Sequence, residues 1–555
     1  MNLDLVISIV LLSPLAFIAT AITSWFQPGL RPELVKNLGI GSAVISILSA
    51  LVGGYAVIQN GFLESASFGL EGIGLSIRLD SVSILMFAMI AIIGFVVVKF
   101  SLNYLDGDHR QGRFIGRLAA TIASVQFLVL AGNLGILLLS WILTSISLHR
   151  LLVFYHERPG AVVAARKKYI MARFGDVSLF IASLLLYFQF GTGNLEMIFS
   201  GTTELISAGA VTSEIEIAGL FLVLAALFKS AQFPTHGWLI EVMETPTPVS
   251  ALLHAGLLNA GPFLLIRMAF VMEASSYASV VIIAIGGFTA LFASLAFLTQ
   301  TSVKTALGYS SVAHMGFSLF VCGLGVYHAA MLHLMAHSFY KAHSFLSSGS
   351  IIDRLRATKV VKAQRIGNPF RILLGFIFGA AIYTGFAMIW GIDPVEEVAL
   401  FAIGAIIVMG LTTLFASAFD SNGSVRLLLR ASFMAIIVAA SFFALETGAH
   451  FLLQTQIPEM LGLSITEKVL TGVVLTAFAL VVLLQIMAPV LSSRPTYIKF
   501  AIHLRNGFYA NAIFDRLIGA LRVKAFQNPV DSTDAIAGSA YKESYQLKEL
   551  EKQNA

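Results

Sequence analysis

The 555-residue sequence has a single cysteine, Cys322, and few charged residues. One thiol cannot form an internal disulfide, and an iron–sulfur cluster needs about four thiolates, so we do not expect the chain to carry electrons. Only 12% of the residues are charged, whereas soluble domains average about 25%. This deficit excludes a water-soluble globule.

Several motifs are also missing. The sequence contains no Walker-type GxxxxGK[ST], no nucleotide fingerprint and no serine-hydrolase elbow, which argues against ATP-driven transport by this chain alone. The net charge of +5 is spread over connecting segments rather than collected in a basic tract, so nucleic acid is not expected as a partner. The first apolar run has no basic n-region before it and no cleavage site near Trp25, so we expect it to remain as the first helix.

What the sequence does contain is a series of long apolar runs. A bilayer-spanning helix needs roughly 20 mainly apolar residues, and unbroken runs without period-two alternation indicate helices rather than barrel strands. We therefore predict an all-α polytopic membrane protein in the lipid bilayer, with about 14 transmembrane helices. The predicted spans are 4–26, 38–59, 80–101, 114–131, 133–155, 170–190, 216–240, 249–272, 278–299, 303–325, 328–350, 370–390, 398–419, 431–450 and 467–491.

The runs suggest four regions along the chain. Residues 1–110 are predicted to form N-terminal transmembrane helices, 111–355 a translocation core and 356–495 C-terminal transmembrane helices. Residues 496–555 mix charged and apolar residues, as in an interfacial or partner-docking segment, and the polar end from Asp531 is expected to be loose.

Lys229 gives the strongest chemical signal because it follows the apolar run 220–228. A mid-membrane ammonium costs at least about 3 kcal/mol on insertion scales, so it normally faces a polar pathway. The alternative is a lysine that snorkels to the interface. Pro234 lies five residues later, and a proline within a helix removes a hydrogen bond, so we predict a broken helix there. A lysine beside a broken helix suggests an ion site.

The next polar connection runs from Glu241 to Pro248 and leads into an apolar stretch containing His254. Pro246 and Pro248 are further predicted helix breaks, and Glu241 and Glu244 are either functional acids or ordinary loop charges. A neutral imidazole at His254 could accept and pass a proton near physiological pH, or it could be a structural hydrogen-bonded histidine.

His333, His337 and Lys341 are spaced four residues apart, which places them on one helical stripe about 6 Å apart. Such a stripe can pass protons through intervening water. Two histidines at this spacing can also bind zinc, but no third ligand is evident and the lysine would repel a metal, so we assign no metal site. Lys304 either extends the path or marks a helix end.

These residues resemble the antiporter-like subunits of complex I and of Mrp-type sodium/proton antiporters. The matching segments are Lys229–Pro234, Pro246–His254, His333–Lys341 and Ser347–Ser350. The resemblance implies a bundle with inverted repeats and broken-helix half-channels. It also implies that Lys229 is the central proton-handling lysine, coupled through His254 and Lys304 to His333, His337 and Lys341.

Two departures from that family are visible. The family has a glutamate directly after a tryptophan in its fifth helix, whereas Trp141 is followed here by Ile142. Glu241, Glu244 and Asp176 are the candidate replacement counter-ions. The family's second-half lysine has no counterpart in the uncharged run 372–390, so the exit half-channel is not evident.

A narrower resemblance is to the membrane subunits of DAB-type inorganic-carbon accumulation complexes. It rests on Ser147–Tyr155, Glu157–Pro159, Ala164–Lys168, His254–Gly256, Asn259–Gly261 and Asn506–Arg516. The resemblance implies a bacterial inner-membrane location and a large carbonic-anhydrase-like partner of DabA type, which holds the zinc and performs the catalysis. The present chain would be a transporter subunit without a cofactor. It would let protons, or alternatively sodium, drive hydration of CO2 to bicarbonate in the partner.

Three other functions are alternatives for such a chain. A proton-pumping subunit of complex I or a membrane-bound hydrogenase is disfavoured by the missing glutamate after Trp141. An Mrp-type antiporter subunit would show sodium-dependent proton exchange. A pure membrane anchor would have no reason to keep several ionisable clusters in lipid, where each is costly.

Overall fold

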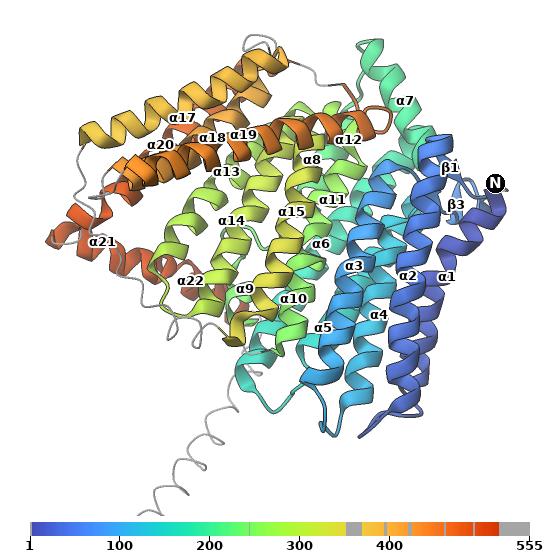
Figure 1. Cartoon of the computed structure of the whole chain (residues 1–555). Coiled ribbons are helices and arrows are strands. Elements are labelled where there is room, and N and C mark those ends of the chain that lie inside the picture. The colour runs from blue at the N-terminus through green and yellow to red at the C-terminus, as the bar shows by residue number, and fades with distance from the viewer. Residues whose placement is uncertain are drawn as a thin grey trace, which may run out of the picture.

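The computed structural model describes residues 3–242, 245–350, 369–392, 397–419, 425–459, 462–491 and 494–520. Within these ranges, eleven helices are long and apolar enough to cross a membrane, which confirms the all-α polytopic class. Helices α4, α14 and α15 are 19, 21 and 20 residues long and lie in the same bundle (Figure 1). The total of about 14 crossings stays a prediction.

The first third of the chain forms long helices joined by short extended segments. The helices are α1 (Leu3–Thr23), α2 (Glu33–Asn60), α3 (Ser81–Tyr104), α4 (Gln111–Val129), α5 (Leu134–Leu152) and α6 (Pro159–Phe190). Between α2 and α3, β1 (Leu63–Glu64) pairs antiparallel with β4 (Arg78–Leu79), and β2 (Phe68–Leu70) with β3 (Ile73–Leu75). Leu63 lies opposite Leu79, and Phe68 opposite Leu75.

The central part is more broken. Its elements are α7 (Leu195–Ser207), α8 (Ser213–Lys229), α9 (Gly237–Glu241), α10 (Thr247–Ala255), η2 (Leu257–Asn259), α11 (Ala260–Arg267), α12 (Ala269–Glu273), α13 (Ser276–Thr299), α14 (Val303–Gly323), α15 (Tyr327–Leu346) and η3 (Ser348–Ser350). The predicted spans 216–240 and 249–272 are thus each divided into shorter helices.

The last described helices are arranged differently from the bundle. They are α17 (Pro369–Trp390), α18 (Val398–Phe419), α19 (Val425–Leu453) and α20 (Ile465–Leu491), followed by α21 (Pro495–Arg505), η4 (Gly507–Tyr509) and α22 (Ala510–Ala520). Figure 1 shows α17 to α20 crossing one end of the bundle at a steep angle to its other helices. The polar end predicted to be loose from Asp531 lies outside the described residues.

Side-chain caps fix where several of these helices begin. Asp80 accepts a hydrogen bond from the Ser83 amide at the start of α3, and Asn133 accepts one from the Ile136 amide at the start of α5. Each cap satisfies a backbone N–H that has no partner within the helix. Helices α3 and α5 therefore start at defined residues.

Asp80 is also the centre of a buried ionic network. Its carboxylate lies 2.6 Å from Arg78 Nε and 2.6 Å from Arg267 Nη1, and Arg78 reaches Glu196 at 2.7 Å. Burial alone would raise the pKa of Asp80, but the charges of Arg267 and Arg78 lower it below its usual range. The network ties the segment before α3 to the end of α11.

Glycines allow α13 and α14 to approach closely. A Cβ on Gly286 would meet the Gly316 carbonyl oxygen at 2.9 Å, and a Cβ on Gly316 would meet the Ala290 nitrogen at 2.7 Å. Small residues at helix contacts let backbones pack closely within membranes. This contact holds α14, which carries His314, against the bundle.

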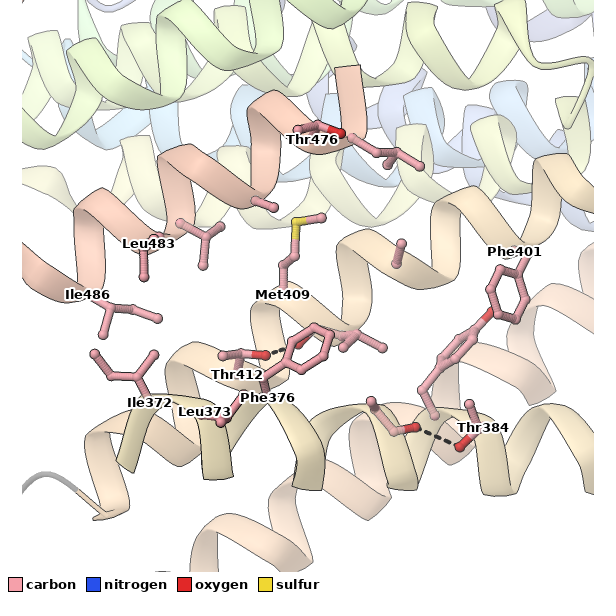
Figure 2. Close-up of a pocket in the computed structure, with 17 residues that line it drawn as sticks. Ile372, Leu373, Phe376, Thr384, Phe401, Met409, Thr412, Thr476, Leu483 and Ile486 are labelled. Carbon is pink, nitrogen blue, oxygen red and sulfur yellow. Dashed lines mark hydrogen bonds between the residues drawn. The ribbon is translucent and has the colours of Figure 1, made fainter. Parts of the chain in front are cut away.

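An apolar cavity of about 700 Å³ lies among α17, α18 and α20 (Figure 2). Its threonines are satisfied locally: Thr412 donates to the Val408 carbonyl at 2.7 Å and Thr384 to the Ala380 carbonyl at 2.8 Å. Tyr383 is the one ionisable residue among those that line it. The cavity does not provide a polar path through α17.

Candidate proton-handling site

Lys229 is the last residue of α8, and its side chain is 8% exposed. Its ammonium donates to the Trp141 carbonyl at 2.9 Å, to Thr144 Oγ1 at 3.0 Å and to Ser145 Oγ at 2.7 Å. It also lies 4.1 Å from the centre of the Trp141 ring. All three acceptors are neutral and belong to α5, so the ammonium can lose a proton, and the resulting amine regain one, without breaking a direct ion pair.

The backbone is non-helical directly after Lys229. Residues 230–236 separate α8 from α9, and Pro234 lies within this break. Ala231 has a φ of 53° there, and the Ser230 hydroxyl donates to the Leu258 carbonyl at 3.0 Å. An interrupted helix leaves backbone polar groups available beside the lysine.

Asp176 is the candidate counter-ion that lies near Lys229. It is buried on α6, pairs with Arg173 at 2.6 Å, and its charge acts on that of Lys229. Lys168, also buried on α6, donates to the Ser145 carbonyl at 2.8 Å, so the main chain and side chain of Ser145 contact two lysines. We name Lys168, Arg173, Asp176 and Lys229 the Lys229 group. It combines three cations with one carboxylate.

Glu241 is engaged elsewhere. Its two carboxylate oxygens accept from Lys167 Nζ at 2.8 and 2.7 Å, and Asn511 of α22 donates to it at 2.6 Å. Lys167 also lies 2.5 Å from Asp515. The counter-ion of Glu241 is therefore Lys167 rather than Lys229. Glu244 lies outside the described residues.

Pro246 and Pro248 lie at the start of α10, where a missing N–H costs little. They mark the entry into the helix, and the interruption of this span comes later, where Gly256 and the single turn η2 separate α10 from α11. Asn259 of η2 donates to Ser338 of α15 at 2.6 Å. The second break therefore faces the helix with the histidine stripe.

The stripe on α15 meets histidines from two other helices. His333 Nε2 lies 3.3 Å from His314 Nδ1 of α14, and the rings of His314 and His337 are 4.9 Å apart. His254 of α10 stacks on Phe345 at 4.3 Å. We name His254, His314, His333, His337 and Lys341 the histidine group.

Buried imidazoles in this group lack protein partners. Within the part of the chain that the structure describes, both ring nitrogens of His254 and of His337 are buried without a hydrogen bond. Because buried polar atoms almost always have partners, we expect water molecules to bond these nitrogens. Protons can move along such histidine–water chains.

Lys341 is the last member of the histidine group along α15. Its ammonium donates to the Leu307 carbonyl at 3.2 Å and to Ser310 Oγ at 2.7 Å, both on α14. Lys304 lies one turn before Leu307, in the first turn of α14, and is partly exposed. The structure thus places Lys304 at a helix end close to Lys341.

His236 was missed in the sequence analysis. It lies in the break after Lys229, is buried, and packs against Phe292 at 5.1 Å and Tyr309 at 6.2 Å. Tyr309 precedes Ser310, the partner of Lys341. The available signal was that His236 is the one titratable residue among residues 230–236, the break between α8 and α9. His236 thus packs against the residue next to Ser310, which accepts from Lys341.

Broken helices around a central buried lysine, with a second ionisable group beside it, define an antiporter-like membrane subunit. Residues 67–115 match the family model described as NADH-ubiquinone oxidoreductase (complex I), chain 5 N-terminus. Residues 131–384 match the model described as NADH:quinone oxidoreductase/Mrp antiporter, TM. The class predicted from the sequence is confirmed.

More specifically, the chain belongs to the DabB family of inorganic carbon transporter subunits. It is 35% identical to the probable inorganic carbon transporter subunit DabB2 of Halothiobacillus neapolitanus, over 88% of each chain. It is 36% identical to the probable subunit DabB of Hydrogenovibrio crunogenus, over 71% of this chain and 74% of that one. NADH-ubiquinone oxidoreductase chain 5 of Acanthamoeba castellanii is 32% identical over 63% of this chain and 54% of its own.

Solved structures show the same fold. A chain of the Mrp complex from Dietzia sp. aligns with a TM-score of 0.62 and 21% identity, covering 99% of this chain and 63% of that one. A chain of an archaeal membrane-bound sulfane sulfur reductase aligns with a TM-score of 0.55 and 16% identity, covering 88% and 99%. These similarities extend to the fold alone.

Proposed function

We propose that this chain is the proton-conducting membrane subunit of an inorganic-carbon transporter in a bacterial inner membrane. The observation that carries the proposal is the setting of Lys229, a buried ammonium whose hydrogen-bond acceptors are all neutral oxygens. A lysine paired directly with a carboxylate is held in its charged form, whereas this one can exchange its proton. The names of the DabB relatives supply the transported class.

The proposed path begins at the polar connection near Pro246 and Pro248 and loads Lys229. Protons then move by way of His254 and Lys304 to His333, His337 and Lys341, with His236 bridging the two groups. The close ring contacts among His314, His333 and His337 support transfer within the histidine group. Each transfer moves one proton between neighbouring nitrogens or through water.

Catalysis belongs, in this proposal, to a large carbonic-anhydrase-like partner of DabA type that holds zinc. Hydration of CO2 by water gives bicarbonate and one proton, so coupling to downhill proton movement can drive the reaction in one direction. A docking surface is available on α21, which exposes the apolar side chains of Ile498, Phe500 and Ile502. Such a surface suits a protein partner or the bilayer interface.

The test is Lys229→Ala in cells that depend on this transporter for bicarbonate accumulation. Uptake should fall to background because the variant cannot load a proton, while the amount of assembled chain in the membrane is unchanged. Lys99→Ala is the matched control, because Lys99 is an exposed lysine on α3 outside both groups. Wild-type uptake by Lys229→Ala would refute the proposal.

A second candidate is an Mrp-type sodium/proton antiporter subunit, favoured by the match of residues 131–384 to the NADH:quinone oxidoreductase/Mrp antiporter model. Sodium-dependent proton exchange in membrane vesicles would support it. Purification from the native membrane separates the candidates further. The carbon transporter predicts one large zinc-containing partner, whereas an antiporter or a redox pump predicts a set of other membrane subunits.

A further inference from the structure

A second ionisable cluster lies where α15 meets α19. His328 Nε2, in the first turn of α15, is 2.8 Å from Glu446 Oε1 of α19, and the two side chains are 3% and 10% exposed. The ring of His450, one turn after Glu446, lies 5.1 Å from that of His328. A buried carboxylate with two imidazoles is costly to keep in a membrane protein and is usually functional.

The cluster adds ionisable residues nearer the start of α15. His328 precedes His333 by five residues, which is about 7.5 Å along the helix axis and about 140° around it, so the two side chains leave α15 on different sides. From His328 to Lys341 the line covers 13 residues, or about 20 Å of a hydrocarbon core roughly 30 Å thick. Because His333 belongs to the histidine group, His328 lies on the side of that group toward the end of the bundle crossed by α19 (Figure 1).

The family's second-half lysine has no counterpart on α17, and α19 is the helix that supplies ionisable residues here instead. Helix α17 is uncharged over residues 372–390, and the cavity beside it is apolar (Figure 2). Two further carboxylates, Glu273 of α12 and Glu467 of α20, act electrostatically on Tyr327, the residue before His328. This end of α15 therefore has acidic surroundings, which favour cations. Glu446 and His450 also lie outside residues 131–384, which match the antiporter model.

We propose that His328 and Glu446, with His450 beside them, form the site through which protons pass between the histidine group and the membrane face near the start of α15. This inference rests on the proposed proton conduction. Glu446 takes one proton from the His328 imidazolium and releases it to water, or the reverse, depending on the gradient. Transfer within the pair leaves its net charge unchanged, release to water removes one positive charge, and a proton from the histidine group restores it.

The test measures proton flux through the purified complex in vesicles loaded with a pH-sensitive dye. His328→Gln combined with Glu446→Gln preserves a hydrogen bond between the helices but removes both proton carriers. Flux should fall at least about tenfold, as for loss of an acid–base group, with assembly and thermal stability retained. The single variant Glu446→Asp, which keeps a carboxylate, should conduct more than the double variant and less than wild type. His343→Gln is the control, because His343 is an exposed histidine on the same helix.

The outcomes separate this inference from the proposed function. If Lys229→Ala abolishes flux while the double variant conducts like wild type, the His328–Glu446 site is wrong and proton conduction stands. If Lys229→Ala itself conducts normally, proton conduction through Lys229 fails. If Glu446→Asp conducts no better than the double variant in assembled complex, a carboxylate relay at this position is also overturned.

Discussion

At the scale of single residues, Ser145 explains how two buried lysines can lie near each other. Its carbonyl accepts from Lys168 and its hydroxyl from Lys229, so each ammonium has a fixed oxygen partner. Like charges that approach in a low-dielectric region repel, and Asp176 is the carboxylate that offsets them. Asp176 of α6 is therefore the candidate replacement for the glutamate that the family has after this tryptophan.

Asp176→Asn tests this arrangement. Losing the carboxylate should lower unfolding free energy by about 2–3 kcal/mol, less than for a fully buried pair because Arg173 is 36% exposed. Proton flux should fall roughly tenfold, since about 1.4 kcal/mol of support for the charged lysine is lost. Thermal unfolding and vesicle flux measure the two effects. Glu204→Gln, which neutralises an exposed carboxylate on α7, should change neither; wild-type values for Asp176→Asn would exclude Asp176 as the counter-ion.

Sequence reasoning found the residues whose charge is exceptional for their surroundings. Lys229 follows an apolar run and Lys341 belongs to a regular stripe, so their cost in lipid was evident. Lys168 was hidden because it stands in the basic stretch Arg166–Arg173, which begins before the predicted span 170–190. Helix α6 begins at Pro159, so this stretch is helical and Lys168 is buried. His328 and Glu446 were missed because their pairing depends on how α15 and α19 meet.

At the scale of elements, the short helix α9 connects the Lys229 break to the end of the described chain. Lys167 and Glu241 pair on one side, and Asn511 and Asp515 of α22 join them. Helices α9 and α22 lie in contact at the same end of the bundle (Figure 1). The segment predicted to dock a partner is thus attached next to the break that follows Lys229.

Lys167→Ala should loosen this attachment because it leaves Glu241 and Asp515 without their shared cation. We expect hydrogen exchange of the α22 amides to quicken by about tenfold, corresponding to roughly 1.4 kcal/mol of lost local stability. Lys499→Ala on α21 removes an exposed lysine of the same charge and should leave this exchange unchanged. Equal protection in wild type and Lys167→Ala would show that the ion pairs do not hold α22.

Helix positions were more predictable than interruptions. Run length alone placed α18 at residues 398–419, as observed, and α13 within two residues of its start. The break at Pro234 followed from the proline. The interruption at Gly256 has no proline within it, and the β hairpins and α7 are too short or too amphipathic to stand out among long apolar runs.

At the scale of the whole molecule, the proposed proton path runs from the Lys229 group through the histidine group to the His328–Glu446 pair. Its middle lies in the part of the chain that matches the antiporter model, and its last members come from α19. The crossing of α17 to α20 over one end of the bundle brings α19 to α15 (Figure 1). The sequence could not predict this crossing, because an apolar helix has the same composition whichever way it lies.

The most direct test of proton-driven carbon accumulation uses the complex purified with its natural partners and reconstituted in vesicles. Bicarbonate formed from labelled CO2 is measured while a proton gradient, a sodium gradient or neither is imposed. The account predicts that bicarbonate rises above its equilibrium level only with the proton gradient, and that a protonophore or Lys229→Ala abolishes the rise. Accumulation that is independent of the proton gradient, or intact in Lys229→Ala, would contradict it.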